Sequence, residues 1–327
     1  MKAMGLTVFG GPEVLRELSV DRPACGEKEI LVQVKGVSVN YADLQTRRGA
    51  YHAGGNRFPV IPGLDAAGTV AEVGAQVKNL RPGQRVIAFP HSGTYAEYVV
   101  ADEALVFPVP EELTWEQAIA CPLVSFTAHM LLHRVARLER GETLLLHAAS
   151  GGVGAAAIQL AREAGAGKII GTVGSRRKVQ AALDAGADAV FCLTESGFSD
   201  RVLEETGGRG ADVILDSLGG PYTVEGMACL APYGRMVAFG NASGAYSQLE
   251  TGLFHASCRS LLGFSIGSTR RMRPEWFAGT AAGVLESLRA GRLRIPVSAQ
   301  FQMTEAAAAH ALLEKREVTG KVLLQVC

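Results

Sequence analysis

The sequence predicts an α/β protein of two domains, with a β-rich first part and a doubly wound parallel sheet in the second part. Three observations lead to this fold class. The chain has 327 residues, which is the usual size of about two domains. From Thr143 onward, strand-like and helix-like stretches alternate, as is typical of βαβ units. The 39 glycines and 6% aromatic residues suit tight strand-to-helix turns better than an aromatic-rich β-sandwich.

The first third of the chain favours strands, because apolar and polar residues alternate there between turns that contain glycine. The expected strands are 29–36, 68–74, 84–89 and 95–100. The spacing of apolar residues then changes, and residues 115–133 have helical spacing.

The alternating part begins with a strand at 143–147, a glycine-rich turn and a helix that runs through Arg162. Further strands are expected at 168–173, 187–192, 211–216 and 234–239, with helical stretches between most of them. Residues 260–266 look like an edge strand. Residues 276–290 and 304–315 look helical, and a strand at 320–326 comes last.

Charge and cysteine content exclude several classes of protein. Lys plus Arg and Asp plus Glu both number 32, so there is no basic excess to hold a nucleic-acid backbone. The six cysteines are far apart, which is typical of reduced thiols. Residues 143–161 carry no charged side chain, but their central glycines fit a buried strand-turn-helix better than a membrane span. With no signal peptide at the N-terminus, we expect a cytoplasmic protein that binds neither nucleic acid nor membrane.

The glycine-rich turn at 147–154 indicates a nucleotide site. It joins an apolar strand to an apolar helix, and this context makes the pattern informative. Small side chains let the backbone approach a pyrophosphate, and the N–H groups at the helix start carry partial positive charge toward it. Gly154 would allow close packing of the helix. An ordinary tight turn could have the same glycines, but the surrounding βαβ units favour the nucleotide site.

The end of the next strand indicates which dinucleotide binds. NAD sites usually carry Asp or Glu there, which accepts a hydrogen bond from the ribose 2′-hydroxyl. This chain instead has no carboxylate in that turn and continues with Gly174, Ser175, Arg176, Arg177 and Lys178. Arg and Lys hold the roughly two negative charges of a 2′-phosphate, which a carboxylate would repel. A solvated helix start would explain one or two cations but not the missing acid, so the sequence favours NADPH.

With these motifs, the chain resembles the zinc-independent quinone oxidoreductase (zeta-crystallin-like) family of the medium-chain dehydrogenase/reductase superfamily, nearly end to end. The family signature is matched by Gly141, Glu142, Leu145, Ala149, Ser150, Gly151, Gly152, Gly154, Gln159 and Arg162. Supporting segments are 40–43, 48–51, 61–68, 216–219 and 239–244. The resemblance implies a GroES-like β-rich catalytic domain (1–123 and 267–327) and a Rossmann-type doubly wound parallel sheet that binds NADPH (124–266).

The resemblance also bears on zinc. Alcohol dehydrogenases of the superfamily bind a catalytic zinc through Cys, His and Cys, and those positions correspond here to Asn40, Leu64 and Leu123. Leucine cannot ligate zinc, and the cysteine-rich lobe of a structural zinc is missing between Val86 and Val99. Cys121 has no partners nearby and is interpreted as a core thiol. We therefore expect no metal, and we expect acceptors that spread charge through conjugation, such as quinones and activated enones.

The resemblance assigns candidate roles to residues. The candidate catalytic residues are Tyr51, Asn40, Asp43 and Thr127. Tyr51 would bond or protonate the acceptor oxygen, or else pack in its loop, and Asp43 would be a structural partner or a proton-transfer group. The candidate cofactor-binding residues are Tyr41, Gly151, Gly152, Val153, Gly154, Gly174, Ser175, Arg176, Arg177, Lys178, Ser217, Asn241, Ala242, Ser243, Gly244, Ser265, Ile266, Gly267 and Arg316. A tyrosine that stacks near the adenine phosphate in some relatives is Leu193 here, which weakens the argument for a strict NADPH preference.

The function implied is that of an NADPH:quinone oxidoreductase. Two alternatives stay open: an NADPH-dependent reductase of enones or enoyl thioesters, and a non-catalytic NADPH-binding, crystallin-like protein. The size of the acceptor pocket would distinguish the quinone oxidoreductase from the enone or enoyl thioester reductase, and the loop 51–59 is expected to determine that size. Relatives often pair an edge strand such as 260–266 across a two-fold axis, so we expect a homodimer.

Overall fold

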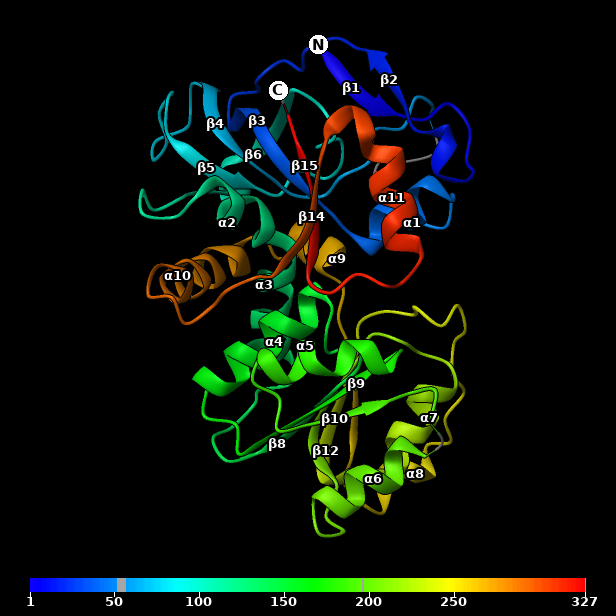
Figure 1. The fold of residues 1–327 in the computed structure, drawn as a ribbon. Coiled ribbons are helices and arrows are strands. Elements are labelled where there is room, and N and C mark those ends of the chain that lie inside the picture. The colour runs from blue at the N-terminus through cyan, green and yellow to red at the C-terminus, as the bar shows by residue number, and fades with distance from the viewer. Residues whose placement is uncertain (52–56, 196, 327) are drawn as a thin grey trace. The chain divides into compact units, whose positions relative to one another are not determined.

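The computed structural model describes residues 1–51, 57–195 and 197–326, and in it the chain forms two compact units (Figure 1). Unit 1 combines Met1–Phe126 with Gly267–Cys327, and unit 2 is Thr127–Ile266. The expected domain boundary at 123 and 124 lies just before the first of these divisions.

Unit 2 is built on a parallel sheet whose six described strands follow the order β10-β9-β8-β11-β12-β13. The strands are β8 (Thr143–Leu146), β9 (Lys168–Val173), β10 (Ala189–Cys192), β11 (Ala211–Asp216), β12 (Leu230–Ala238) and β13 (Ser260–Gly263). β9 and β10 lie on one side of β8, and the later strands lie on the other. The predicted doubly wound sheet is confirmed, and its strand order reverses between β8 and β11, where such sheets bind ligands.

One helix of unit 2 precedes its first strand, and the others lie between its strands. These helices are η3 (Leu131–Val135), α4 (Gly152–Glu163), η4 (Arg176–Lys178), α5 (Val179–Asp184), α6 (Phe198–Glu205), α7 (Pro221–Ala228) and α8 (Gly252–His255). Strands covered on both faces become continuous apolar runs, and β8 and β11 follow this rule. Leu145 and Ile214 on these strands are completely buried, in a cluster with Phe191, Phe198 and Met236.

Unit 1 contains a larger sheet drawn from both ends of the chain. Its described strands run in the order β14-β15-β3-β4-β5-β7, and β6 also pairs with β3. These strands are β3 (Glu29–Val39), β4 (Ala66–Val73), β5 (Arg85–Ala88), β6 (Tyr98–Asp102), β7 (Val106–Pro108), β14 (Val297–Gln302) and β15 (Lys321–Gln325); β1 (Lys2–Gly5) and β2 (Arg16–Ser19) form a separate hairpin. Val322 of β15 lies opposite Val39 of β3, so the last strand completes the sheet.

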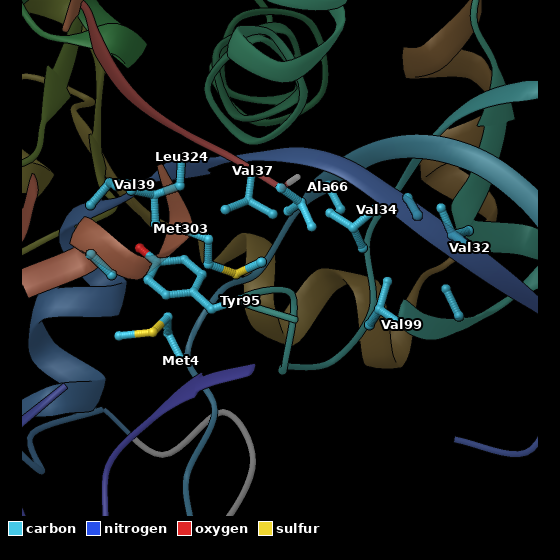
Figure 2. Packing of buried hydrophobic residues seen from close by; sticks show 14 of the residues in the cluster. Met4, Val32, Val34, Val37, Val39, Ala66, Tyr95, Val99, Met303 and Leu324 are labelled. Carbon is cyan, nitrogen blue, oxygen red and sulfur yellow. The ribbon is translucent and has the colours of Figure 1, made fainter. Parts of the chain in front are cut away.

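The other elements of unit 1 surround this sheet. They are η1 (Pro12–Val14), α1 (Tyr41–Arg47), η2 (Glu103–Leu105), α2 (Trp115–Ala120), α3 (Pro122–Met130), α9 (Ile266–Met272), α10 (Glu275–Arg289), η5 (Met303–Glu305) and α11 (Ala306–Glu314), of which α3 and α9 continue across the divisions between units. The core of unit 1 combines side chains of β3 with others from distant parts of the chain. Figure 2 shows Val32, Val34, Val37 and Val39 in this cluster together with Tyr95. Tyr95 is completely buried, so its hydroxyl must find a partner inside the protein.

Two expected elements differ in their bounds. The helical stretch 115–133 is divided into α2, α3 and η3. The break between α2 and α3 falls at Pro122, which has no N–H to continue the first helix. The expected edge strand 260–266 ends at Gly263, and Ile266 already begins α9. β13 is nevertheless the last strand of the described sheet, with β12 as its neighbour.

Candidate active site

The glycine-rich turn of unit 2 brings backbone N–H groups to the start of α4. Gly151 precedes the helix without a side-chain cap, and the first N–H groups of a helix have no partner within it. A Cβ on Gly154 would lie 2.5 Å from the carbonyl oxygens of Ala148 and Ala149, so only glycine fits there. Ala148 adopts a left-handed conformation with φ of 54°. The N–H groups of Gly152 and Val153 are therefore placed to meet an anion.

Buried polar side chains next to this turn hydrogen-bond to the ends of the neighbouring strands. The Nδ1 atom of His147 lies 2.8 Å from the hydroxyl of Thr172 at the end of β9. Burial lowers the pKa of His147 to about 4, although the carboxylate of Asp216 favours its charged form. Asp216 in turn accepts hydrogen bonds from the N–H groups of Leu218 and Gly219, at 2.8 and 3.0 Å. A neutral histidine and an anchored aspartate thus hold the ends of β8, β9 and β11 in place.

Two hydroxyls at the carboxyl ends of these strands lack partners. Among the described residues, the Oγ atoms of Ser175 and Ser217 are buried and make no hydrogen bond. Buried hydroxyls usually find a partner, and these two follow β9 and β11. They are free to bond the sugar and phosphate of a nucleotide, so the residues present fit a dinucleotide.

The turn after β9 is basic, as expected, but a carboxylate from the next strand reaches it. Arg176 donates from Nε to Oε1 of Glu195 at 2.8 Å, and Arg201 donates to Oε2 of the same carboxylate at 2.9 Å. Arg177 and Lys178 belong to the same turn, η4. Glu195 was not predicted as part of this site, because it follows β10 and lies outside the turn after β9.

A recess in unit 2 lies at the carboxyl ends of β12 and β13. Its volume is about 660 Å³, and two of the candidate cofactor-binding residues, Asn241 and Ser265, line it. Most of its other lining is apolar, including Phe239, Phe254 and Phe264. The candidates Ala242, Ser243 and Gly244 follow in the same loop, and the candidate Thr127 is buried on α3.

In unit 1, the amide of Asn40 is fixed from three sides. Its Nδ2 donates to the carbonyl oxygen of Ser38 at 3.0 Å and to Oδ1 of Asp65 at 2.8 Å. Its Oδ1 accepts from the ammonium of Lys321 at 2.6 Å. Both N–H bonds of this amide are therefore committed within the protein. The structure thus shows the candidate catalytic residue Asn40 bonded to Ser38, Asp65 and Lys321.

Asp43 lies beside this amide and is completely buried. Its Oδ2 accepts from the backbone N–H of Asn40 at 2.8 Å and from the hydroxyl of Tyr95 at 3.3 Å. The same hydroxyl lies 3.0 Å from Nε2 of His310 on α11. Oδ1 of Asp43 has no hydrogen-bond partner among the described residues. A chain of polar groups therefore runs from α1 through the core to α11.

Three charged groups of this network shift one another's pKa. Burial, with a smaller contribution from the negative charge of Asp65, raises the pKa of Asp43 to about 7, although the hydrogen bond from the backbone of Asn40 and the charge of Lys321 oppose the rise. The pKa of Asp65 is also raised by burial, and that of Lys321 is lowered by burial. Burial beside Arg47 lowers the pKa of His310 to about 3, so this ring is neutral. The network can hold a proton at neutral pH.

The remaining candidates of unit 1 lie at different places. Tyr51 is partly buried in the loop after α1, and Tyr41 is exposed on the first turn of that helix. Gly267 is in α9, and Arg316 follows α11 with φ of 54°. Residues 52–56 of the loop expected to shape the acceptor pocket lie outside the described residues.

The positions that correspond to zinc ligands in alcohol dehydrogenases hold an amide, Asn40, and two leucines, Leu64 and Leu123. Leu64 and Leu123 are buried, and the backbone N–H of Leu123 donates to Asp65. Burial also raises the pKa of the Cys121 thiol. Within the described residues, no three His, Cys, Asp or Glu side chains are grouped to hold a metal ion. The same residues include no helix that is both long enough and apolar enough to cross a membrane.

Sequence reasoning missed four members of the buried network: Asp65, Tyr95, His310 and Lys321. A signal existed, since Asp65 stands alone in the apolar segment 61–68 and Lys321 opens an apolar strand. A charged side chain at such a position must be paired when it is buried. The partner itself could not be read, because Lys321 and Asn40 are 281 residues apart.

Known proteins similar to this chain match nearly its whole length. The alcohol dehydrogenase GroES-like domain matches residues 26–111, and the zinc-binding dehydrogenase family matches residues 152–280. The quinone oxidoreductase of Salmonella typhimurium is 36% identical over 328 residues, covering 96% of each chain. That of Pseudomonas aeruginosa is 35% identical and covers 99% of each chain. The structure of Escherichia coli quinone oxidoreductase complexed with NADPH superposes with a TM-score of 0.92 at 31% identity, covering 99% of this chain and 100% of that one.

Proposed function

Since the chain belongs to the quinone oxidoreductase family of the medium-chain dehydrogenases/reductases, we propose that it is a zinc-independent oxidoreductase that uses NADPH. Its acceptors are quinones or similar conjugated carbonyl compounds. The relatives described above are named for this activity, and one of them was solved with NADPH.

The turn after β9 supports NADPH most directly. It carries Arg176, Arg177 and Lys178, and the buried hydroxyl of Ser175 beside them has no partner within the described structure. Cations and a free hydroxyl donor suit a 2′-phosphate. Gly152 and Val153 bind the pyrophosphate, and Ser217 bonds the adenosine side.

The reaction needs a hydride and a proton. Bound NADPH supplies the hydride, and with one proton a quinone becomes a hydroquinone while NADP⁺ remains. Tyr51 is our candidate for hydrogen bonding to the acceptor oxygen and for donating that proton. Asp43 is completely buried and already accepts two hydrogen bonds at Oδ2, so it positions α1 and the backbone of Asn40.

Zinc independence rests on the side chains at the ligand positions. Leu64 and Leu123 offer only hydrocarbon, and the amide of Asn40 is bonded to Ser38, Asp65 and Lys321. Such a set cannot provide the three N, O or S ligands that a catalytic zinc uses. The acceptor must therefore spread the incoming charge itself, which favours quinones and activated enones over simple ketones.

Steady-state oxidation of NADPH and NADH with a quinone, an enone and a simple ketone tests this function. We expect fast turnover of the quinone with NADPH, slower turnover with NADH, and none of the ketone. Prior treatment with a strong zinc chelator should leave the rate unchanged. Turnover of the ketone, or loss of activity after chelation, would contradict zinc independence. Equal rates with both cofactors would contradict the assignment of the 2′-phosphate to Arg176 and its neighbours.

Two alternatives share this cofactor site. A reductase of enones or enoyl thioesters would turn over the enone faster than the quinone. A non-catalytic, crystallin-like protein would bind NADPH and turn over none of the three acceptors.

In each case we propose a homodimer formed through β13, whose outer edge has no neighbouring strand in the described sheet.

A further inference from the structure

The basic turn after β9 and the turn after β10 lie next to each other. β9 and β10 are adjacent parallel strands, with Val173 paired to Cys192 at their carboxyl ends. The backbone N–H of Leu193 continues this pairing and donates to the carbonyl oxygen of Val173 at 2.8 Å. Glu195 follows two residues later and so reaches the turn that carries Arg176.

Glu195 is shared between two arginines. Its Oε1 lies 2.8 Å from Nε of Arg176, and its Oε2 lies 2.9 Å from a terminal nitrogen of Arg201. The guanidinium of Arg201 also stacks on the ring of Phe191, 4.1 Å from its centroid. Arg201 is thus held by two contacts, whereas the side chain of Arg176 is 82% exposed.

We propose that Glu195 is a specificity-determining residue, whose ion pair with Arg176 weakens the interaction of that guanidinium with the 2′-phosphate of NADPH. This inference rests on the proposed function, because it takes Arg176 as a ligand of the 2′-phosphate. A carboxylate and a phosphate compete for the same guanidinium, and the carboxylate also repels the incoming dianion. Glu195 therefore weakens the binding of NADPH and leaves that of NADH unchanged.

The contact with Arg201 makes this exchange feasible. When a phosphate takes Arg176, Glu195 keeps its bond to Arg201 and is not left as an unpaired charge. Glu195 is also partly exposed, with 35% of its side chain accessible, so water can solvate the oxygen that is released. Exposed ion pairs are weak, so the expected effect on NADPH affinity is modest, about two- to fivefold.

The test is the dissociation constant of NADPH and of NADH, measured by the fluorescence of the reduced nicotinamide on the whole chain without an acceptor. The variants are Glu195→Gln and a matched control, Glu205→Gln. Glu205 pairs with Lys168 at 2.9 Å, at the opposite end of β9, so its replacement removes the same charge from the same unit. Circular dichroism verifies that each variant is folded.

We expect Glu195→Gln to tighten NADPH binding about two- to fivefold with no change for NADH, and Glu205→Gln to change neither. Unchanged or weaker NADPH binding in Glu195→Gln would overturn the proposal, as would an equal gain in Glu205→Gln. A third variant, Arg176→Gln, separates this inference from the proposed function. If Arg176→Gln weakens NADPH binding but Glu195→Gln has no effect, only the role of Glu195 fails. If wild type binds both cofactors equally and Arg176→Gln has no effect, both proposals fail.

Discussion

Asp43 makes the stability of the folded protein fall as the pH rises, which is the opposite of the usual effect of a carboxyl group. Its pKa is about 7 in the folded chain because of burial, against 3.8 for an ordinary aspartate. The folded state therefore binds this proton more tightly than the unfolded state. The contribution of Asp43 to stability is complete below about pH 4 and is lost as the pH rises to about 7, by at most about 1.4 kcal/mol per pH unit.

The variant Asp43→Asn should remove this dependence, because asparagine still accepts bonds from Asn40 and Tyr95 but carries no titrating proton. Urea unfolding between pH 4.5 and 8 measures it. We expect the unfolding free energy of wild type relative to Asp43→Asn to fall across this range and to level off above pH 7. Asp200→Asn, an exposed aspartate on α6, is the control and should run parallel to wild type. Parallel curves for Asp43→Asn as well would contradict the assignment.

The sequence predicted which residue types occupy the candidate sites better than it predicted their hydrogen-bond and ion-pair partners. The missing acid after β9 could be read directly from the sequence, whereas the meaning of the leucines at 64 and 123 came from the resemblance to a known family. The bonds of Lys321 to Asn40, and of Tyr95 to His310, join residues 281 and 215 apart, so a single sequence held no sign of them. Glu195 is only 19 residues from Arg176, but it follows β10, and its contact with Arg176 depends on β9 and β10 being neighbours.

At the scale of elements, the packing of α4 depends on Gly154. An added methyl group would lie 2.5 Å from two backbone carbonyl oxygens, so Gly154→Ala must push the helix away from the turn. We expect a loss of roughly 1–3 kcal/mol in unfolding free energy and, because the helix N–H groups move, weaker NADPH binding. Urea unfolding and fluorescence titration measure these effects. Gly252→Ala, where a Cβ meets nothing within 4 Å, should change neither. Wild-type behaviour of Gly154→Ala would show that the turn tolerates a side chain.

The helix α9 is tied to two loops of unit 1 by one buried guanidinium. Arg270 donates to the carbonyl oxygens of Leu64 and His91, at 3.0 and 3.1 Å, and to that of Pro90. We expect Arg270→Met to cost about 3 kcal/mol in unfolding free energy, because these buried carbonyls lose their donor. Arg273→Met is the control, since Arg273 is mostly exposed and its pair with Glu275 spans 3.8 Å. Equal stability of both variants in urea would refute the role of Arg270.

Elements with strong patterns were predicted, and those that depend on context were not. The strand at 211–216 coincides with β11 because its apolar run is short and continuous. β14 was missed although Val297, Ala299 and Phe301 alternate with polar residues, which is the pattern of a half-buried strand. The helical spacing predicted over 115–133 took no account of Pro122, at which α3 begins.

At the scale of the whole molecule, the proposed homodimer predicts that β13 is covered. Leu261 on this strand is 43% exposed in the single chain. We expect Leu261→Arg to shift the mass measured by light scattering from that of a dimer toward that of a monomer, because a charge would be buried in the interface. Val8→Arg, which changes another exposed apolar side chain, in unit 1, should leave the mass of a dimer. A wild-type chain that is a monomer at micromolar concentration would refute the proposal.

The fold class could be predicted from the sequence because strands and helices alternate regularly between Thr143 and Phe239. The assembly of unit 1 could not be predicted from periodicity, since its sheet joins β3 to β15. Only the resemblance to a known family suggested that the two ends of the chain belong together.

The pairing of β3 with β15 determines which sheet can be completed first while the chain is being synthesised. Every strand of the parallel sheet has been synthesised once Gly263 has emerged, whereas β3 must wait for residues 321–325 before its edge is covered. Meanwhile its valines and the buried carboxyls near Asn40 lack their final neighbours, including the ammonium of Lys321. The growing chain therefore exposes an open, apolar sheet edge during most of its synthesis, and this edge is where a nascent-chain chaperone would be expected to act.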